Sequence, residues 1–259
     1  MKAIMLAAGV GRRLYGDSKD QPPKALISLG GKTLLQRHVE NLLKLGVDEL
    51  VVVVGYRRQL ITEAATQTAI AAGRPGFVRT LHNPRFRGGP VLSLWTAREV
   101  LYGGDDVLFM DADVLYHPHM LERLVRSRHA TCLLMDNDVD AGEDPVRICL
   151  RDGHLVEFGK KVVGDFDRIG EWPGFMKLSP DIARAVGEAT ERCVDQGRLE
   201  VTYEVAMREV MLSHPRGTFG VEDITGVPWI EIDFPSDLWR AEQHVLPRLS
   251  ERYPETGAA

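Results

Sequence analysis

The sequence predicts an α/β protein with a mostly parallel sheet flanked by helices and a small α+β extension. Over the first 140 residues, short apolar runs alternate with segments whose apolar residues recur at helical spacing, which is typical of β-α-β units. The run at 49–55, ELVVVVG, is apolar almost throughout, as expected of a strand covered on both faces. After residue 140 the segments become shorter, and Asp152-Gly153 separates two of them as a hairpin turn would.

The elements of the first part follow from this periodicity in chain order. Residues 3–7 form the first strand, leucines and Val39 then recur at helical spacing over 34–43, and Gly46 ends that helix. Further strands are predicted at 49–55, 77–81, 107–110 and 131–135, and further helices at 59–72, 91–101 and 120–127. Because strands and helices alternate, we expect helices on both faces of the sheet.

The second part mixes short strands with longer helices. The predicted elements are a hairpin with strands 147–150 and 155–158, a strand at 175–178, helices at 180–195 and 203–212, a strand at 229–232 and a last helix at 236–252. No segment resembles an interdomain linker. We therefore expect one domain over 1–259, with a core at 1–140, an extension at 141–227, and a return strand with a C-terminal helix at 228–259.

The bulk composition argues against several classes of protein. The net charge of −5 lacks the basic excess of a general nucleic-acid binder, and no apolar run reaches the ~18 residues of a membrane span. The three widely spaced cysteines, Cys132, Cys149 and Cys193, include no Cys-x-x-Cys pair, so neither a disulfide framework nor a zinc site is expected. We therefore expect a cytoplasmic protein that binds no nucleic acid and does not insert into a membrane.

A glycine turn after the first strand is the most informative motif. Residues 6–14 read LAAGVGRRL, and Pro23-Lys24 follows about one loop later. Backbone N–H groups in such a turn can approach a triphosphate closely, and Arg13 and Lys24 can add charge-assisted hydrogen bonds. The pattern therefore indicates a site for a nucleoside triphosphate.

Two commoner nucleotide-binding patterns are absent. The dinucleotide fingerprint needs glycine at Leu14, and a phosphate loop ending in the GKT at 31–33 needs glycine at Leu26. The GKT is instead expected to be a surface turn before a helix. Alternatives stay open for the cations as well: Arg12 and Arg13 could be a solvated helix start, and Lys24 a plain loop lysine.

Two carboxylates follow a later strand at the same edge of the predicted sheet. Asp111 and Asp113 come directly after the strand 107–110, and their oxygens are the kind of ligand that Mg²⁺ prefers. The alternative for this Asp-x-Asp is a solvated turn. Since ligands of open α/β sheets bind at the carboxyl ends of the strands, the convergence of these acids with the glycine turn favours a functional site.

The combination resembles the sugar-nucleotidyltransferase superfamily, whose fold is of the Rossmann-like GT-A type. The superfamily pattern reads L-A-A-G-x-G-T-R-L followed by P-K, and this chain has Arg12 in place of the threonine. The resemblance implies an enzyme in which Arg13 and Lys24 are catalytic and Mg²⁺ is held by Asp111 and by Asp233 of the WIEIDFPSD stretch. It also implies nucleotide contacts from the glycine turn, at Leu6, Ala7, Ala8, Gly9 and Gly11.

Within the superfamily, the chain is most similar to bacterial cytidylyltransferases that act on phosphocholine, inositol phosphate or 2-aminoethylphosphonate. The stretch at 83–99 matches at Asn83 and Ser93, which implies further nucleotide contacts, whereas Gly89 and Pro90 replace asparagines of the relatives. The stretch at 157–179 and a Tyr-Glu pair before a helix imply the acceptor contacts, at Lys160, Glu171, Gly174, Tyr203 and Glu204.

The charged end of an acceptor could be bound in two ways. An aromatic side chain could enclose a trimethylammonium group by cation–π contact; the candidates are Trp172, Phe175, Tyr203 and Trp229. The alternative for Phe175 and Trp229 is that they are core residues of strands. Glu171 and Glu204 could instead pair with a primary ammonium group.

These observations predict an Mg²⁺-dependent nucleotidyltransferase that uses CTP and a small phospho-alcohol or phosphonate. The acceptor oxygen would attack the α-phosphorus and diphosphate would leave, so positioning and charge neutralisation would carry catalysis. The core at 1–140 would bind the nucleotide and the extension at 141–227 the acceptor. Alternatives are a sugar-1-phosphate uridylyl- or thymidylyltransferase, a molybdopterin nucleotidyltransferase, and, in another class, a non-catalytic regulatory module that binds nucleotides. The acceptor, the base and the existence of a homodimer stay open.

Overall fold

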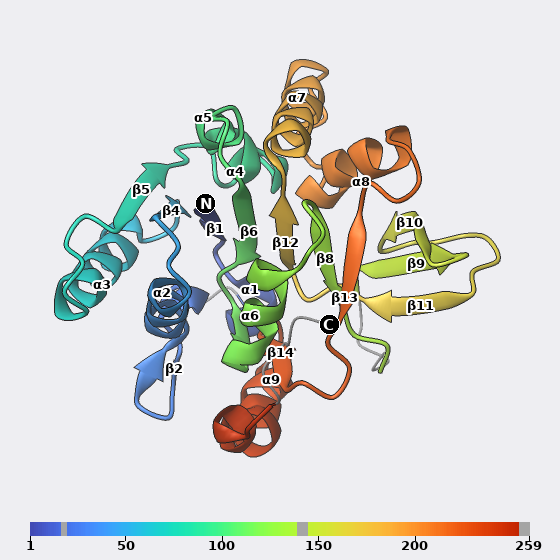
Figure 1. Ribbon diagram of the computed structural model, residues 1–259. Coiled ribbons are helices and arrows are strands. Elements are labelled where there is room, and N and C mark those ends of the chain that lie inside the picture. The colour runs from blue at the N-terminus through green and yellow to red at the C-terminus, as the bar shows by residue number, and fades with distance from the viewer. Residues whose placement is uncertain (17–19, 139–144, 254–259) are drawn as a thin grey trace.

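A seven-stranded sheet forms the centre of the molecule (Figure 1). A computed structural model describes residues 1–16, 20–138 and 145–253 of the chain. The strand order across the sheet is β13-β8-β12-β6-β1-β4-β5. The strands are β1 (Lys2–Ala7), β4 (Glu49–Val54), β5 (Val78–His82), β6 (Val107–Asp111), β8 (Cys132–Met135), β12 (Phe175–Leu178) and β13 (Gly220–Asp223).

The predicted α/β fold with a mostly parallel sheet is confirmed. β1 pairs in parallel with β4 and β6, β4 with β5, and β8 with β13. β12 is the exception, because it pairs antiparallel with both β6 and β8. The chain enters β12 by a tight turn that follows a neighbouring small sheet, and not by a crossover helix, so the strand runs in the opposite direction.

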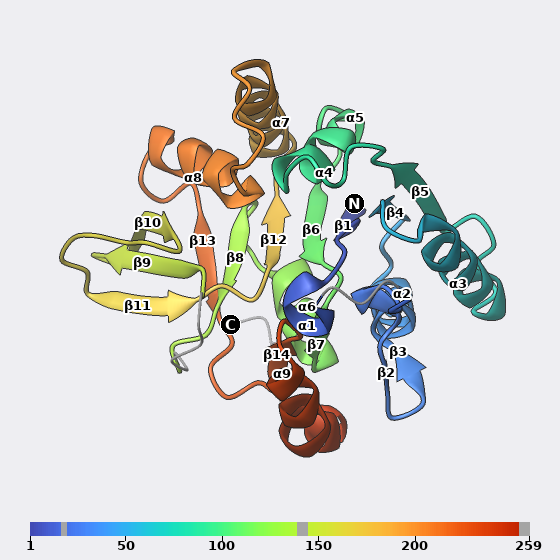
Figure 2. The ribbon, with the colours of Figure 1, turned by 180° about the vertical axis from the view of Figure 1, so that it is seen from behind.

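Helices cover both faces of the sheet, as Figures 1 and 2 show from opposite sides. One face packs against α2 (Leu34–Lys44), α3 (Arg58–Ala71) and α6 (Pro118–Arg126). The other packs against α4 (Val91–Thr96), α5 (Arg98–Leu101), α7 (Pro180–Asp195) and α8 (Tyr203–Ser213).

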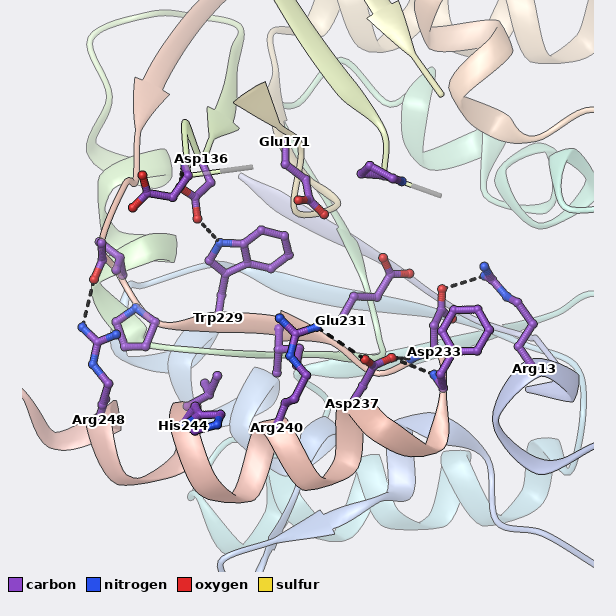
Figure 3. A pocket seen from close by; sticks show the side chains of 18 residues that line it. Arg13, Asp136, Glu171, Trp229, Glu231, Asp233, Asp237, Arg240, His244 and Arg248 are labelled. Carbon is purple, nitrogen blue, oxygen red and sulfur yellow. Dashed lines mark hydrogen bonds and ion pairs between the residues drawn. The ribbon is translucent and has the colours of Figure 1, made fainter. Parts of the chain in front are cut away.

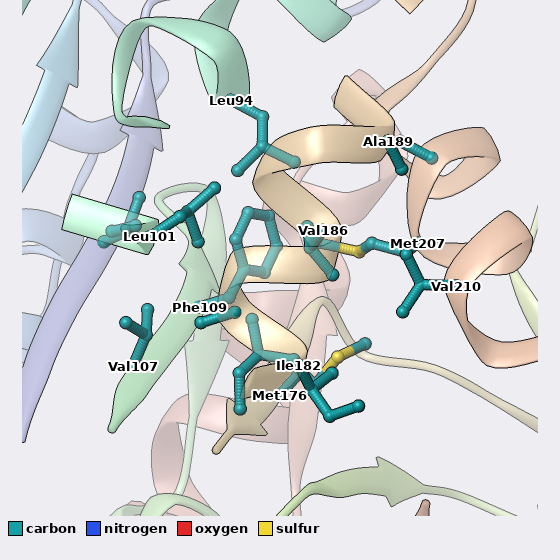
Figure 4. Packing of buried hydrophobic residues seen from close by; sticks show 14 of the residues in the cluster. Leu94, Leu101, Val107, Phe109, Met176, Ile182, Val186, Ala189, Met207 and Val210 are labelled. Carbon is teal, nitrogen blue, oxygen red and sulfur yellow. The ribbon is translucent and has the colours of Figure 1, made fainter. Parts of the chain in front are cut away.

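Alternate residues of each central strand enter opposite cores. Val107 and Phe109 of β6 lie in the same hydrophobic cluster as Val186 of α7 and Met207 of α8, as Figure 4 shows. Leu108, between them, lies in the cluster on the other face. Successive strand side chains point to opposite faces, so a strand covered on both sides must be apolar throughout. This explains the unbroken apolar runs of the sequence.

A three-stranded antiparallel sheet lies within the range 141–227 that was expected as an extension, whereas β12 and β13 of that range belong to the central sheet. The three-stranded sheet consists of β9 (Arg147–Arg151), β10 (His154–Gly159) and β11 (Arg168–Glu171), in the order β10-β9-β11. The hairpin turn expected at Asp152-Gly153 is confirmed, with φ of 52° and 75° at the two residues. Both values lie in the left-handed region that such a two-residue turn requires. β11 was not predicted from the sequence.

The GKT at 31–33 forms a hairpin and a helix cap, as expected of a surface turn. Gly30 and Gly31 join β2 (Ser28–Leu29) to β3 (Lys32–Thr33), and the Thr33 hydroxyl accepts a hydrogen bond from the backbone N–H of Gln36 at 3.1 Å. That bond caps α2.

Two predicted helices are interrupted. The helix expected at 91–101 divides at Ala97 into α4 and α5. The helix expected at 236–252 begins as α9 (Pro235–Arg240), widens into a π-helical turn at Ala241–Val245 and tightens into a 3₁₀ segment at Leu246–Ser250. Pro247 has no backbone N–H to donate, which prevents regular α-helical hydrogen bonding across that segment.

Two further short strands help to build the site. β7 (Val114–Tyr116) pairs antiparallel with β14 (Trp229–Glu231), with Val114 opposite Glu231. β14 corresponds to the strand predicted at 229–232, whereas β7 was not predicted. Within the described part of the chain, none of the helices is long and apolar enough to cross a membrane.

Candidate active site

A cavity of about 530 Å³ opens at the carboxyl ends of β1 and β6. Its lining includes fifteen of the sixteen residues that the sequence analysis assigned to a site: Leu6, Ala7, Ala8, Gly9, Gly11, Arg13, Lys24, Ser93, Asp111, Lys160, Glu171, Gly174, Tyr203, Glu204 and Asp233. Asn83 does not line the cavity; it is buried behind it, and its amide donates to the Ser93 hydroxyl at 3.2 Å. The topology thus brings together residues that lie more than 200 positions apart.

The glycine turn places its cations over the cavity. Gly11 has φ of 73° and precedes the single-turn helix α1 (Arg12–Tyr15). A Cβ atom at Gly11 would lie 3.2 Å from Cγ of Lys24 and 3.3 Å from the ring of Tyr15, so a larger residue would press on both. Glycine therefore allows the turn to lie against the lysine stem in a conformation that other residues rarely adopt.

Lys24 lies between two carboxylates from different parts of the chain. Its Nζ is 2.9 Å from Oδ2 of Asp113 and also donates a hydrogen bond to Oδ1 of Asp233. Arg13 adds a second cation, with Nη2 2.7 Å from Oδ2 of Asp233. Burial by itself disfavours the charged form of Lys24, but the two carboxylates outweigh it and raise the pKa of the ammonium group. Lys24 is therefore positively charged across the physiological range.

Three acids lie together beside these cations. One carboxylate oxygen each from Asp113, Glu231 and Asp233 lies within 4.8 Å of the others. The pairing of β7 with β14 brings them together, and the backbone N–H of Ile232 donates to the carbonyl of Asp113 at 2.9 Å. Carboxylate oxygens at this spacing fit a hard divalent cation.

The structure groups Asp233 with different acids from the one predicted. Asp111 was expected to share a metal with Asp233, but it lies outside the three-acid cluster, and its Oδ2 accepts a hydrogen bond from the Tyr203 hydroxyl at 2.6 Å. Glu231 was missed by the sequence analysis. Its spacing two residues before Asp233 was the available signal, because alternate residues of a strand point to one face.

Burial and neighbouring carboxylates raise the pKa values of two acids in the cavity. Burial and the neighbouring Asp113 raise the pKa of Asp111 well above its usual value, although the hydrogen bond from Tyr203 opposes the shift. The pKa of Glu231 rises to about 8, first because the cavity walls displace its water and then because Asp113 and Asp233 repel its charge. Glu231 is an exposed residue, and it lines both this cavity and a second one next to it.

We expect the variant Glu231→Gln to raise the melting temperature near pH 8.5, and to change it less near pH 5, in metal-free buffer. The pKa of Glu231 is about 8 in the folded protein against an ordinary 4.5, so the folded state holds an extra proton between these values. Stability conferred by that proton is complete below the unfolded-state value and is lost as the pH rises through about 8, whereas glutamine does not ionise.

Thermal unfolding with a chelator present would measure the effect. Glu242→Gln, on the exposed side of the π-helical turn, is the matched control and should shift the melting temperature equally at both pH values. An equal shift at both pH values for Glu231→Gln would contradict the prediction.

The end of the cavity next to Asp111 is acidic and aromatic. Glu204 is only 9% exposed, and its Oε2 has no hydrogen-bond partner. Trp172 and Tyr203 also line this end, together with Glu200. Of the other aromatic candidates, Phe175 is a core residue, in agreement with the alternative stated for it. An unpartnered buried carboxylate is costly unless a ligand satisfies it.

A second cavity of about 450 Å³ adjoins the first and shares Arg13, Glu171, Glu231 and Asp233 with it. Figure 3 shows Asp136 on one side of it and the C-terminal helical segment on the other, with Trp229 between them. The indole N–H of Trp229 donates to Oδ2 of Asp136 at 2.7 Å. Trp229 therefore lines this neighbouring cavity.

Residues 3–168 of the 259 match the family described as "MobA-like NTP transferase domain". The chain is 28% identical over 275 residues to the CMP-5'-(3-aminopropyl)phosphonate synthase of Streptomyces rubellomurinus, which covers 99% of this chain and 41% of that protein. It is 41% identical over 267 residues to a UTP–glucose-1-phosphate uridylyltransferase of Haloferax volcanii, which covers 97% of this chain and 99% of that protein.

Among solved structures, the inositol-1-phosphate CTP transferase from T. maritima superposes with a TM-score of 0.74 at 18% identity, covering 98% of this chain and 97% of that one. At this identity the likeness shows a shared fold. The chain spans only 41% of the phosphonate synthase and 52% of another curated relative, the bifunctional IPC transferase and DIPP synthase of Rubrobacter xylanophilus.

Proposed function

The chain belongs to the family of MobA-like NTP transferase domains, and from this membership we propose that it transfers a cytidylyl group from CTP to a small phosphorylated or phosphonate acceptor. One observation carries the proposal: the glycine turn, the half-buried Lys24, the exposed Arg13 and a three-acid cluster converge on one cavity at the carboxyl ends of β1 and β6. Such a cavity offers backbone donors and cations for a triphosphate and hard oxygen ligands for a divalent cation.

We assign the triphosphate end to the glycine turn. Backbone N–H groups around Gly9 and Gly11 would bind phosphate oxygens, Arg13 would neutralise the β- and γ-phosphates, and Lys24 the α-phosphate. The acceptor oxygen would attack the α-phosphorus in line, the bond to the β-phosphate oxygen would break, and diphosphate would leave. Each cation would then stabilise charge that grows on the leaving group.

Asp113, Glu231 and Asp233 would hold Mg²⁺, because their oxygens form the hard donor set that this ion prefers. When bound, Mg²⁺ would supply positive charge to the reacting phosphates. Asp111 lies beside this cluster with its carboxylate oriented by Tyr203. The sequence analysis expected Asp111 and Asp233 to hold the ion. The present assignment retains Asp233, adds Asp113 and Glu231 as ligands, and places Asp111 next to them.

The acceptor end of the cavity favours a cationic acceptor. Glu204 has a buried oxygen without a partner, and Glu200, Trp172 and Tyr203 surround the same space. A primary or quaternary ammonium group would satisfy the carboxylate and contact the aromatic faces, whereas a neutral sugar hydroxyl would leave the charge uncompensated. The phosphonate synthase relative supports an amine-bearing acceptor, and the uridylyltransferase relative supports the sugar alternative.

The test is diphosphate release with Mg²⁺, crossing CTP, UTP, dTTP, ATP and GTP with phosphocholine, 2-aminoethylphosphonate, inositol-1-phosphate and glucose-1-phosphate. We expect release with CTP and an amine-bearing acceptor. Release with UTP or dTTP and glucose-1-phosphate would instead indicate a sugar-1-phosphate uridylyl- or thymidylyltransferase. Tight nucleotide binding without release from any pair would favour a regulatory module.

Glu204→Gln serves as the matched variant in the same assay. We expect it to lower kcat/KM for the amine-bearing acceptor by about tenfold or more, because a charged hydrogen bond is lost, and to leave KM for CTP unchanged. Equal activity of both proteins with that acceptor would contradict the assignment of Glu204.

A further inference from the structure

We propose that the Lys24 ammonium group occupies the place of a metal ion among the carboxylates of Asp113, Glu231 and Asp233. A divalent cation therefore binds tightly there only after a bound triphosphate has drawn the Lys24 side chain away from these carboxylates. The inference rests on the proposed function and concerns the regulation of the same site. It makes metal loading depend on nucleotide binding.

The position of Lys24 is the first argument. Its Nζ is 2.9 Å from Oδ2 of Asp113 and hydrogen-bonds Oδ1 of Asp233, so it bridges two of the three clustered acids. A cation shared by the same two carboxylates would need the space between them. The side chains of Lys24 and Asp233 are only 14% and 13% exposed, so little water separates their charges.

Charge balance is the second argument. The three acids can carry three negative charges, and Lys24 and Arg13 already supply two positive charges at Asp233. A divalent cation added to this arrangement would gain little attraction and would be repelled by an ammonium group at contact distance. Without Lys24, the same cluster would attract a divalent cation much more strongly.

The third argument is that Lys24 lies beside the glycine turn, where we propose that the triphosphate binds. Its stem lies against the glycine turn, since a Cβ atom at Gly11 would come within 3.2 Å of its Cγ. A triphosphate held by that turn would offer Nζ a new partner after a rotation of the side chain. Arg13, on the same turn, would exchange Asp233 for phosphate in the same way. By linkage, nucleotide and metal should each strengthen the binding of the other.

The experiment measures Mn²⁺ affinity of the full chain by electron paramagnetic resonance, without nucleotide and with a non-hydrolysable CTP analogue. We expect weak Mn²⁺ binding without nucleotide in the unaltered protein, and an affinity about tenfold or more higher in Lys24→Met. The analogue should raise Mn²⁺ affinity in the unaltered protein by a larger factor than in Lys24→Met. Lys24→Arg retains the charge and should retain the weak binding.

Lys32→Met is the matched control, because Lys32 pairs with Glu40 and does not line the cavity. It should leave Mn²⁺ affinity unchanged. An unchanged or lower affinity in a folded Lys24→Met protein, with Asp233→Asn abolishing Mn²⁺ binding, would overturn this inference and leave the proposed metal centre intact. Unchanged Mn²⁺ affinity in Asp233→Asn would overturn the metal centre itself, and the inference with it.

Discussion

Asp233→Asn should lower kcat/KM for nucleotidyl transfer by about 10³-fold. Among the residues that the structure describes, Asp233 is the one acid that pairs with both Lys24 and Arg13 and also belongs to the three-acid cluster. Asparagine has nearly the same shape but no negative charge, so it would weaken metal binding and leave both cations without their partner. Diphosphate release at saturating CTP, with a titration of Mg²⁺, would measure the loss.

A control variant tests whether the removal of any other carboxylate has the same effect on turnover. Asp223→Asn alters an exposed acid of β13 that pairs with Arg168 and lies outside both cavities next to the site. It should retain normal turnover. Activity of Asp233→Asn within about tenfold of the unaltered protein would contradict the role assigned to this residue.

Gly89→Ala should destabilise the protein by roughly 3 kcal/mol, as expected when a residue is forced into a disallowed backbone conformation and a backbone clash together. Gly89 has φ of 137°, and a Cβ atom there would lie 1.7 Å from the carbonyl oxygen of Leu199. The neighbouring backbone is held close as well, since the N–H of Val91 donates to the carbonyl of Val201 at 3.3 Å. Denaturant unfolding with an unchanged slope would give the free-energy difference.

Gly104→Ala is the matched control for this prediction. Gly104 has φ of 80°, and an added Cβ atom would meet no other atom within 4 Å, so only the backbone strain of about 1 kcal/mol should appear. Equal destabilisation by both substitutions would show that the clash with Leu199 does not contribute to the loss in free energy of unfolding. The same contact accounts for glycine at position 89, because a side chain there would clash with the backbone of Leu199.

The fold could be predicted largely from the sequence because its signals are local. A strand with both faces covered must be apolar throughout, so the runs around Val52 and Phe109 identify central strands without any knowledge of their neighbours. The short strands β7, β11 and β13 carry no such signal. Whether a segment of three or four residues forms a strand at the edge of a sheet depends more on the strand it pairs with than on its own composition.

The site could be predicted in its members but only partly in its grouping. The glycine turn and Asp111 follow strands that end at one edge of the sheet, which was enough to place them together. The sequence did not decide which acids share a cation. That depends on the pairing of β7 with β14, which moves Glu231 and Asp233 beside Asp113, while Tyr203 engages Asp111.

The sequence by itself thus determined the α/β architecture, the position of the glycine turn and its cations, and the acids after Met110, because periodicity and turn chemistry act over short stretches of chain. The remaining residues assigned to the site came from the resemblance to a known family. Only the tertiary structure decided that Lys24 bridges Asp113 and Asp233, and that Glu204 has a buried oxygen without a partner. Contacts between residues 89 or 209 positions apart depend on the packing of whole elements. A distance of one or two ångströms there decides whether a carboxylate is paired, and no local pattern encodes it.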